Sequence, residues 1–296
     1  MPEFDLTAFS DARAGLASAA APALVAVEAG GRHGSSAFHW RDGLYVGASE
    51  AIETDDAVTV TDAAGKGQAA TLLGRDPTTG IALLKTAATD AVLQTAARPV
   101  GAGALALSVG RGEAGVIVGL GVVAEAGPAW RSMRGGLIDR RIRLQASLDP
   151  RLEGGAALDA SGGLIGLVLF GPHRRPLVIP AETVERVVTA LASHGHVPRG
   201  YLGAALHPIR QAEIHGAMVM SLDAGGPAAT AGLVLGDVIT AWDGEPVEGV
   251  RGLIRRLGPD SVGNTVVLGV LRGGKAEEVS FTVGARPARE AGHGDR

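Results

Sequence analysis

Short hydrophobic runs dominate the first 170 residues of the chain. Runs rich in β-branched residues alternate with Gly, Asp and Pro, as in ALVAVEA, AVTVTDAAG, IALLKT, GVIVGLGVV and LIGLVLF. Regularly spaced short strands separated by turn residues are typical of an all-β barrel or sandwich. The pattern therefore predicts a mainly β fold for this part of the chain.

The hydrophobic period changes at residue 181. In AETVERVVTALASHG, residues 181–195, the valines and Leu191 recur at helical spacing, and Gly195 is suited to end a helix. HGHVPRG then has the composition of a linker. The expected organisation is an N-terminal segment (1–18), a first domain ending in a helix (19–197), a second domain (198–287) and a disordered tail (288–296).

Composition agrees with two folded domains. The chain has 296 residues, 46% of them hydrophobic, and roughly 150 residues are expected per domain. The net charge of −4 gives no general attraction to nucleic acid or acidic membranes. The absence of cysteine excludes disulfides and thiolate metal sites.

The N-terminus gives an expectation about location. MPEFDLTAFSD is acidic where a secretion signal would be basic. The apolar stretch from Gly15 to Val27 is interrupted by Pro22 and is too short to span a bilayer. We therefore expect no membrane span and a cytoplasmic location, or a periplasmic one if a signal peptide has been removed.

Five stretches carry a resemblance to a known family. In chain order they are GLYVGASEAIETDDAVTV, GRDPTTGIALLK, GLIDRRIRLQASLDPRLEGGAALDASGGLIGL, VIPAETVERVV and GHVPRGYLG. Their order and spacing resemble the HtrA/DegP family of trypsin-like serine proteases, from about residue 20 to residue 287. The resemblance implies a chymotrypsin-like double β-barrel followed by one C-terminal PDZ domain of the α+β class.

The same alignment places the family's catalytic positions on other residue types. The histidine position falls on Glu50, the aspartate position on Gly80 and the serine position on Glu153, while Arg151 replaces the usual glycine of the oxyanion hole. A triad needs a nucleophile, a base and a group that orients the base. A carboxylate beside the oxyanion hole would also repel the developing charge.

These substitutions predict no catalytic residues and no enzyme activity. The expected function is that of an HtrA-like pseudoprotease, acting through its PDZ domain as a protein-binding scaffold, adaptor or chaperone-like subunit. Two alternatives stay open. One is a hydrolase with a rebuilt acid–base site around Glu50 and Glu153, and the other is a residual serine endopeptidase that uses Ser49 or Ser147.

No metal or cofactor is expected. Glu50 and Glu153 could bind a hard cation, but calcium prefers six to eight oxygen ligands, so pairing of Glu153 with Arg151 or Arg143 is favoured. His194 and His196 have no third ligand nearby in the sequence. The arginine-rich region from 131 to 143 has no interleaved stacking aromatics apart from Trp130, so no nucleic-acid binding is expected.

The second domain contains the expected binding site. RGYLGAAL resembles the loop that holds a peptide carboxylate in PDZ domains, and GVRGLIRRL resembles the helix beside the groove. Peptide binding would proceed by strand addition. The predicted peptide-binding residues are Tyr201, Leu202, Gly203, Ala204, Leu253 and Leu257.

The expected partners are proteins or peptides with a hydrophobic C-terminal residue. The resemblance also implies a homo-oligomer, a trimer being one option, or a subunit of a larger complex. Phe4, Leu6 and Phe9 in the N-terminal segment could supply the contacts.

Overall fold

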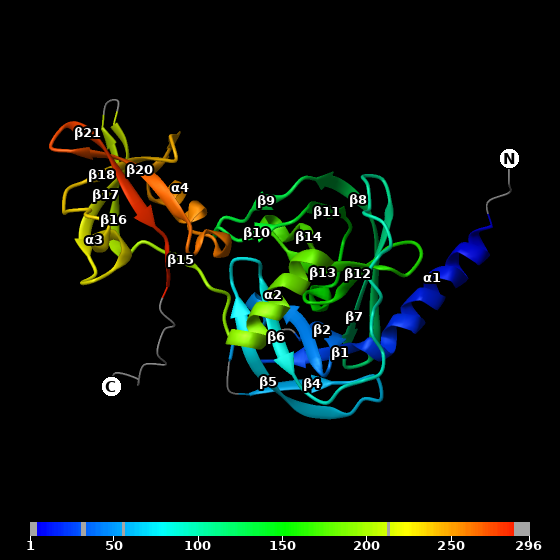
Figure 1. The fold of residues 1–296 in the computed structure, drawn as a ribbon. Helices are drawn as coiled ribbons and strands as arrows, with labels where there is room; N and C mark the ends of the chain where they lie inside the picture. Colours follow the sequence, from blue (N-terminus) through cyan, green and yellow to red (C-terminus); the bar gives the residue numbers. More distant parts are fainter. Residues whose placement is uncertain (1–4, 31–33, 55–56, 212–213, 287–296) are drawn as a thin grey trace. The chain divides into compact units, whose positions relative to one another are not determined.

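The computed structural model describes residues 5–30, 34–54, 57–211 and 214–286 (Figure 1). These residues fall into two units. The first comprises the described parts of Met1–Trp130 and Ile138–His196, and the second those of Arg131–Leu137 and Val197–Arg296. The predicted tail and Phe4 lie outside the described residues.

Six antiparallel strands of the first unit close into a barrel in the order β1-β2-β3-β6-β5-β4. They are β1 (Leu24–Glu28), β2 (Ser35–Arg41), β3 (Leu44–Ala48), β4 (Val58–Thr61), β5 (Gly67–Asp76) and β6 (Ile81–Lys85). β1 pairs with both β2 and β4, so the ring closes. Side chains that alternate inward fill the barrel, among them the buried Val27, Tyr45 and Leu84.

A second barrel has the order β11-β14-β13-β12-β7-β8. Its strands are β7 (Leu105–Gly112), β8 (Gly115–Gly127), β11 (Arg141–Gln145), β12 (Ala156–Leu158), β13 (Leu164–Phe170) and β14 (Pro176–Pro180). Its interior holds buried residues such as Val123, Ile142 and Val168. The short strands β9 (Trp130–Arg131) and β10 (Leu137–Ile138) pair with each other.

Two longer helices belong to the barrel unit. α1 (Leu6–Ala20) begins at Asp5, whose carboxylate caps the Thr7 and Ala8 N–H groups, and it buries only Ala17 and Ala20. α2 (Ala181–His194) ends at Gly195, which adopts a left-handed φ of 72°. The predicted apolar stripe of α2 is buried, so this helix and its glycine cap are confirmed.

Among the described residues, single turns of 3-10 helix occur in both units. They are η1 (Ala21–Ala23), η2 (Ser49–Ala51), η3 (Pro150–Leu152), η4 (Pro172–Arg174) and η5 (Pro259–Ser261). η2 follows β3 in the first barrel and η3 precedes β12 in the second. These two turns carry two of the candidate site positions.

The second unit is built on one antiparallel sheet in the order β16-β17-β18-β20-β21, with β19 paired to β18. Its strands are β15 (Gly200–Tyr201), β16 (Ala204–Gln211), β17 (Ile214–Leu222), β18 (Val238–Trp242), β19 (Glu245–Pro246), β20 (Thr265–Arg272), β21 (Lys275–Thr282) and β22 (Gly284–Ala285). β15 pairs separately with β22. The helices α3 (Pro227–Thr230) and α4 (Gly249–Arg256) complete the unit.

The position of β16 matters for binding. β16 lies at the edge of its sheet, so one of its sides has no strand partner within the described residues. An unpaired edge presents N–H and C=O groups to an added strand. The predicted fold class, a mainly β double barrel followed by an α+β unit, is confirmed.

Candidate functional site

The three predicted triad positions lie at the ends of strands from both barrels. Glu50 is in η2, Gly80 directly precedes β6, and Glu153 directly follows η3. The Ser49 N–H donates a hydrogen bond of 2.8 Å to the Gly80 carbonyl, which holds the first two positions together. Gly80 has a φ of +77°, a conformation that glycine adopts readily.

The loop that carries Glu153 lies against the first barrel. A Cβ atom placed on Gly154 would lie 2.1 Å from the Ser36 carbonyl oxygen and 2.9 Å from the Ala48 nitrogen. Only glycine fits this close approach, and its φ of +85° also favours glycine. The loop of the second barrel is therefore held beside the end of β3, next to the turn that carries Glu50.

Glu153 has an unusual environment for a carboxylate. Its side chain is partly buried, and this burial raises its pKa, with a further increase from the nearby charge of Glu50. A hydrogen bond from the Phe170 N–H and the charge of Arg174 act in the opposite direction. The Arg174 guanidinium lies 5.1 Å from the centroid of the Phe170 ring. Glu50 is exposed, so the two carboxylates are in unequal surroundings.

The expected ion pairs of Glu153 are not the ones that form. Arg151 pairs instead with Asp149, through Nε at 3.0 Å and a terminal nitrogen at 2.7 Å. Arg143 pairs with Glu125. The alternative of an Arg151–Glu153 or Arg143–Glu153 pair is thus wrong, because Arg151 pairs with Asp149 and Arg143 with Glu125.

Backbone N–H groups around Arg151 are used within the loop. The Arg151 N–H donates to the Asp149 carboxylate at 2.9 Å, and the Glu153 N–H donates to the Pro150 carbonyl at 3.1 Å. These are the two positions that would supply an oxyanion hole in a trypsin-type site. In this conformation neither N–H is available to a substrate oxygen.

Ser36 links this loop to the first barrel. Its hydroxyl donates to the Arg151 carbonyl at 2.6 Å and accepts from the Arg111 N–H at 3.0 Å. Its own N–H donates to the Glu153 carbonyl at 2.9 Å. Ser36 is fully buried. The pattern of the sequence contains no signal for this residue, because its role depends on contacts with two segments distant along the chain.

Arg75 supports the turn that carries Glu50. Its guanidinium donates to the carbonyl oxygens of Ser49 at 3.2 Å, Ile52 and Thr54 at 3.5 Å. A planar guanidinium with five donors is well suited to bind several carbonyls of one loop. Arg75 lies in the stretch GRDPTTGIALLK, and its place in that stretch is the one feature of the sequence that points to a role near the site.

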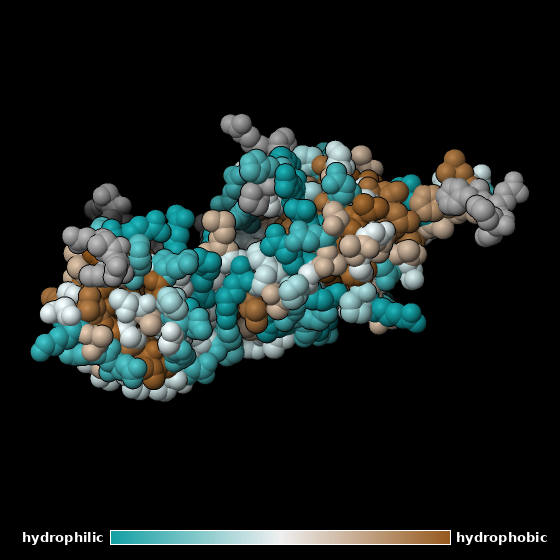
Figure 2. Space-filling view, turned by 90° about the horizontal axis from the view of Figure 1, so that it is seen from above, coloured by the Kyte–Doolittle hydropathy of each residue, from teal (hydrophilic) through white to brown (hydrophobic). Residues whose placement is uncertain are grey.

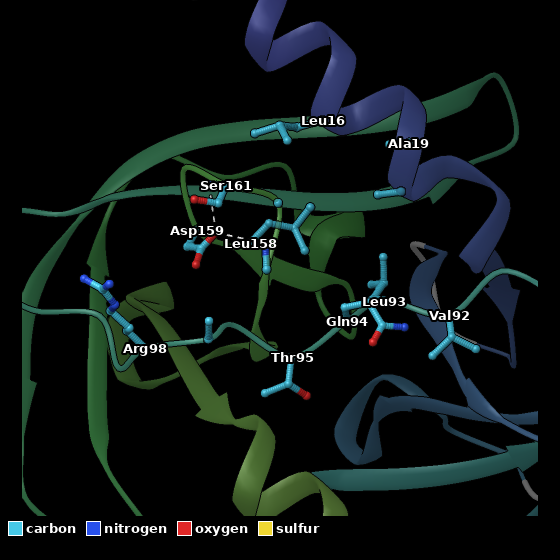
Figure 3. Close-up of a pocket in the computed structure, with 14 residues that line it drawn as sticks. Leu16, Ala19, Val92, Leu93, Gln94, Thr95, Arg98, Leu158, Asp159 and Ser161 are labelled. Atoms are coloured by element: carbon cyan, nitrogen blue, oxygen red, sulfur yellow. Dashed lines mark hydrogen bonds between the residues drawn. The ribbon is translucent and has the colours of Figure 1, made fainter.

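Ser161, in the sequence Ser-Gly-Gly, lies in a different concavity of the barrel unit (Figure 3). This pocket has a volume of about 730 Å³. Asp159 accepts hydrogen bonds of 2.8 Å from the N–H groups of Ser161 and Gly163, which closes the hairpin turn between β12 and β13. No histidine lines this pocket, so it offers Ser161 no imidazole base. The lining residues are Leu16, Ala19, Ala20, Val92, Leu93, Gln94, Thr95, Ala97, Arg98, Leu158, Asp159, Ser161, Gly162 and Gly163.

The two serines considered as alternative nucleophiles differ in exposure. Ser49 is buried and Ser147 is exposed. The described residues contain no group of three or more His, Cys, Asp or Glu side chains placed to hold a metal ion. His194 and His196 are exposed, and their ring centroids are 6.5 Å apart.

Several arginines of the basic region form ion pairs. Arg140 pairs with Glu182, and both Arg141 and Arg143 lie beside Glu125. Arg131 pairs with Asp260 in the second unit. These pairs offset much of the positive charge that the sequence places there.

The predicted carboxylate-binding loop has free donors. Gly203 has a φ of +76°, and neither its N–H nor that of Leu202 donates a hydrogen bond to another described residue. The loop is fixed from behind, because the Asp223 and Ala228 N–H groups donate to the Gly203 and Leu202 carbonyls at 2.9 and 2.8 Å. The Tyr201 hydroxyl donates to the Asp223 carboxylate.

The predicted wall residues of the groove have unequal exposure. Leu202 and Leu253 are buried in the core of the unit, and Leu253 has no exposed surface. Leu257 and Ala204 are only partly buried against the same core. In this conformation the accessible apolar surface at this end of the groove therefore comes from Ala204 and Leu257 rather than from Leu253.

Comparison with known families supports both units. A family model described as a trypsin-like peptidase domain matches residues 34–167, and one described as a PDZ domain matches residues 200–283. A probable periplasmic serine endoprotease DegP-like from Brucella suis is 33% identical over 271 residues, and one from Rhizobium meliloti is 30% identical over 279. These matches cover 83% and 86% of this chain but 51% and 54% of those proteins. The chain thus spans about half the length of these relatives.

Solved structures agree with the sequence comparison. A serine endoprotease from Yersinia pestis is 26% identical, with a TM-score of 0.71 over 93% of this chain and 98% of that one. The HtrA-type protease AlgW with a tripeptide is also 26% identical, with a TM-score of 0.67 over 95% and 99% of the two chains.

The prediction that this chain is not an enzyme is contradicted by these comparisons. The relatives that match most of this chain are named serine endoproteases, and nothing shows this chain to be inactive. The prediction rested on residue types at three positions. The structure places two carboxylates of unequal environment at two of them, and such pairs can carry out acid–base chemistry.

The expected location also needs revision. The relatives are named as periplasmic, which does not support the cytoplasmic expectation. Among the described residues, no helix is long and apolar enough to cross a membrane.

Proposed function

Because this chain belongs to the HtrA family of trypsin-like peptidases with a PDZ domain, we propose that it is a peptide hydrolase whose acid–base pair is Glu50 and Glu153. The observation that carries this proposal is the environment of Glu153. Burial and the charge of Glu50 both raise its pKa, while Glu50 remains exposed. A partly buried glutamate with a raised pKa is suited to act as the acid, and an exposed carboxylate beside it can act as the base.

The proposed reaction is direct attack by water. Ionised Glu50 takes a proton from the water as its oxygen attacks the peptide carbonyl carbon, and protonated Glu153 gives its proton to the carbonyl oxygen. Collapse of the tetrahedral intermediate then breaks the C–N bond. The departing nitrogen receives the proton held by Glu50, and one hydroxyl of the intermediate returns a proton to Glu153 as the carboxylic acid product forms. This route uses no serine nucleophile and no oxyanion hole from the Arg151 and Glu153 N–H groups, which are occupied.

The second part of the proposed function is recognition of peptide C-termini by the PDZ domain. The free N–H groups of Leu202 and Gly203 suit a carboxylate, and the edge strand β16 suits strand addition. Ala204 and Leu257 suit a hydrophobic last residue. The similar AlgW structure contains a tripeptide, which favours peptide ligands for this chain too.

The proposed location follows the names of the relatives. We assign the chain to the periplasm, as their names state for those proteins.

Figure 2 shows hydrophobic surface gathered toward the α1 end of the barrel unit. Leu6 on α1 is 69% exposed, and Leu105, Val118 and Val122 on β7 and β8 are also exposed. This exposed hydrophobic surface supports a homo-oligomer, with a trimer as one option. Light scattering on the full chain measures the molar mass, and a monomeric mass would contradict the proposed oligomer.

Hydrolysis of fluorescently labelled, unfolded casein by the full chain tests the catalytic proposal. Glu153→Gln and Glu50→Gln should each lower the rate about a hundredfold or more, the contribution of a positioned acid or base. Glu53→Gln is the matched control, because Glu53 is exposed and three residues from Glu50. A serine-reactive fluorophosphonate should leave the rate unchanged.

Two results would overturn the proposal. The first is the absence of cleavage by the unchanged chain under all conditions of pH. The second is equal cleavage by the unchanged chain and both glutamine variants. Loss of activity in Ser49→Ala or Ser147→Ala, together with fluorophosphonate labelling, would assign the activity to a serine instead.

A further inference from the structure

The open end of the PDZ groove contains a pocket that the carboxylate loop does not explain. It has a volume of about 940 Å³. It lies between the second half of β16 and the start of α4, both in the second unit. Its lining residues are Pro208, Ile209, Arg210, His215, Pro246, Val247, Glu248, Gly249, Val250 and Arg251.

The hydrogen-bond pattern of β17 shows which groups of β16 face the free edge. Val219 uses both of its backbone groups toward β18, since its N–H donates to Asp237 and its carbonyl accepts from Gly236. In an antiparallel strand the backbone N–H and C=O groups of successive residues point to opposite neighbours. The backbone groups of Met218 and Gly216 therefore point toward β16. Their partners in the register are His207 and Ile209.

It follows that the backbone groups of Leu206, Pro208 and Arg210 point toward the free edge of β16. Leu206 and Arg210 each offer an N–H and a carbonyl there, whereas Pro208 offers only a carbonyl because proline has no N–H. Proline is tolerated on an edge strand for this reason. A peptide added to this edge therefore loses one ladder bond beside Pro208, in the region where the pocket begins.

The register places a definite part of the peptide at this pocket. A peptide antiparallel to β16, with its C-terminus at Ala204, advances at about 3.4 Å per residue, like β16 itself. The peptide residues roughly four to six positions before the last one then lie beside Pro208 to Arg210. Main-chain pairing is weakest there, so side-chain contacts must contribute more of the binding.

The charges of the pocket favour one kind of side chain. Arg210 and Arg251 come from the two walls, and within the described residues neither guanidinium has an ion-pair partner. Glu248 is the single carboxylate that lines the pocket. Arg255, on the next turn of α4, adds further positive charge to this side of the domain.

We propose that this pocket, through Arg210 and Arg251, selects peptides that carry an acidic residue roughly four to six positions before a hydrophobic C-terminus. The inference rests on the PDZ part of the proposed function and does not depend on the carboxylate pair of the barrels. Arginine is suited to this role because its planar guanidinium binds a carboxylate in a bidentate manner.

Fluorescence anisotropy with the full chain tests the proposal. Three free-acid peptides share a hydrophobic last residue and carry glutamate, glutamine or lysine at the upstream positions. The glutamate peptide should bind about two- to fivefold more tightly than the glutamine peptide, the range for an exposed ion pair. The lysine peptide should bind more weakly than both.

Variants assign the effect to the pocket. Arg210→Gln combined with Arg251→Gln should remove the preference for glutamate, so that the glutamate and glutamine peptides bind with equal affinity. Lys275→Gln is the matched control, because it removes one exposed positive charge from the β20–β21 hairpin of the same unit.

The outcomes separate the two levels of the proposal. If all three peptides bind equally, or if the double variant keeps the preference, the acidic selectivity is wrong and the PDZ function stands. If no free-acid peptide binds at all, the PDZ function itself is wrong and the selectivity falls with it.

Discussion

The Ser36 hydroxyl in the first barrel lies 2.6 Å from the Arg151 carbonyl oxygen in the second, although 115 residues separate them along the chain. The same hydroxyl accepts from the Arg111 N–H, and the Ser36 N–H donates to the Glu153 carbonyl. One buried side chain thus fixes the loop of Glu153 to the barrel that carries Glu50. The geometry of the carboxylate pair depends on this junction.

Replacing Ser36 should disturb both stability and hydrolysis. Ser36→Ala leaves the buried Arg111 N–H and Arg151 carbonyl without this partner, at a cost of about 1–3 kcal/mol for an unsatisfied buried group. We expect a lower free energy of unfolding in urea and slower casein hydrolysis. Ser147→Ala, at an exposed position, is the control. Unchanged stability would mean that the junction is held by other contacts.

The pH dependence of the proposed hydrolysis should follow Glu153. Its pKa is raised, mainly by burial, so the protonated form that acts as the acid persists at higher pH than for an ordinary glutamate. Hydrolysis should decrease as the pH rises through this raised pKa. Glu125→Gln should leave the profile unchanged, since Glu125 lies among arginines elsewhere on the barrel. A profile that rises into the alkaline range would contradict the assigned role.

The pH dependence of folding stability should also reflect the raised pKa of Glu153. A carboxylate with a folded-state pKa above its unfolded value stabilises the fold fully below the unfolded pKa, and this contribution is lost as the pH rises through the folded pKa. Glu153→Gln should therefore raise the melting temperature at neutral pH and have little effect in acid. Calorimetry across the pH range measures this difference. A destabilised variant at neutral pH would show that the charged form is the favoured one.

Acid should weaken the PDZ domain through Asp237. This carboxylate is 1% exposed and is bound by Arg272 at 2.9 and 2.7 Å, and the hydrogen bond from Arg272 is the largest cause of its lowered pKa. Stability from Asp237 is present above the unfolded pKa and is lost as the pH falls through the folded one. Asp237→Asn should cost about 1.5–3 kcal/mol, the range for hydrogen bonds to charged groups.

Hydrogen exchange of β18 and β20 reports this effect within the full chain. Glu277→Gln is the matched control, because Glu277 binds the same arginine at 2.9 Å but is 41% exposed. It should cost no more than about 1 kcal/mol, like other exposed pairs. Equal protection in Asp237→Asn and in the control would contradict the assigned weight of the buried pair.

The carboxylate loop can be tested by the ligand and by the protein. Amidation of a bound peptide's C-terminus should weaken binding by about 1.5–3 kcal/mol, the range for hydrogen bonds to charged groups. Gly203→Ala should also weaken it, because the added Cβ would lie 2.9 Å from the Pro227 Cδ. Gly225→Ala is the control, with a similar φ of +69° and no atom near its Cβ. Equal affinity for acid and amide would remove the loop from the binding site.

The sequence by itself determined the fold class and the order of the elements. Its alternating apolar runs are read directly as strands, and the helical spacing before Gly195 as α2, because these periods reflect local backbone geometry. The five ordered stretches also located Glu50, Gly80 and Glu153, and the structure brings the loops that carry them together. Local residue types, however, led to the wrong conclusion about enzyme activity.

Only the tertiary structure decided what surrounds these residues. The raised pKa of Glu153, the bond of Ser36 to Arg151, and the partners of Arg151 and Arg143 depend on segments that are distant in sequence. The exposure of Leu253 and the free edge of β16 likewise depend on how the second unit packs. A residue's type sets which interactions it can form, but burial and the nearest charges decide which of them form, and those exist only in the folded chain.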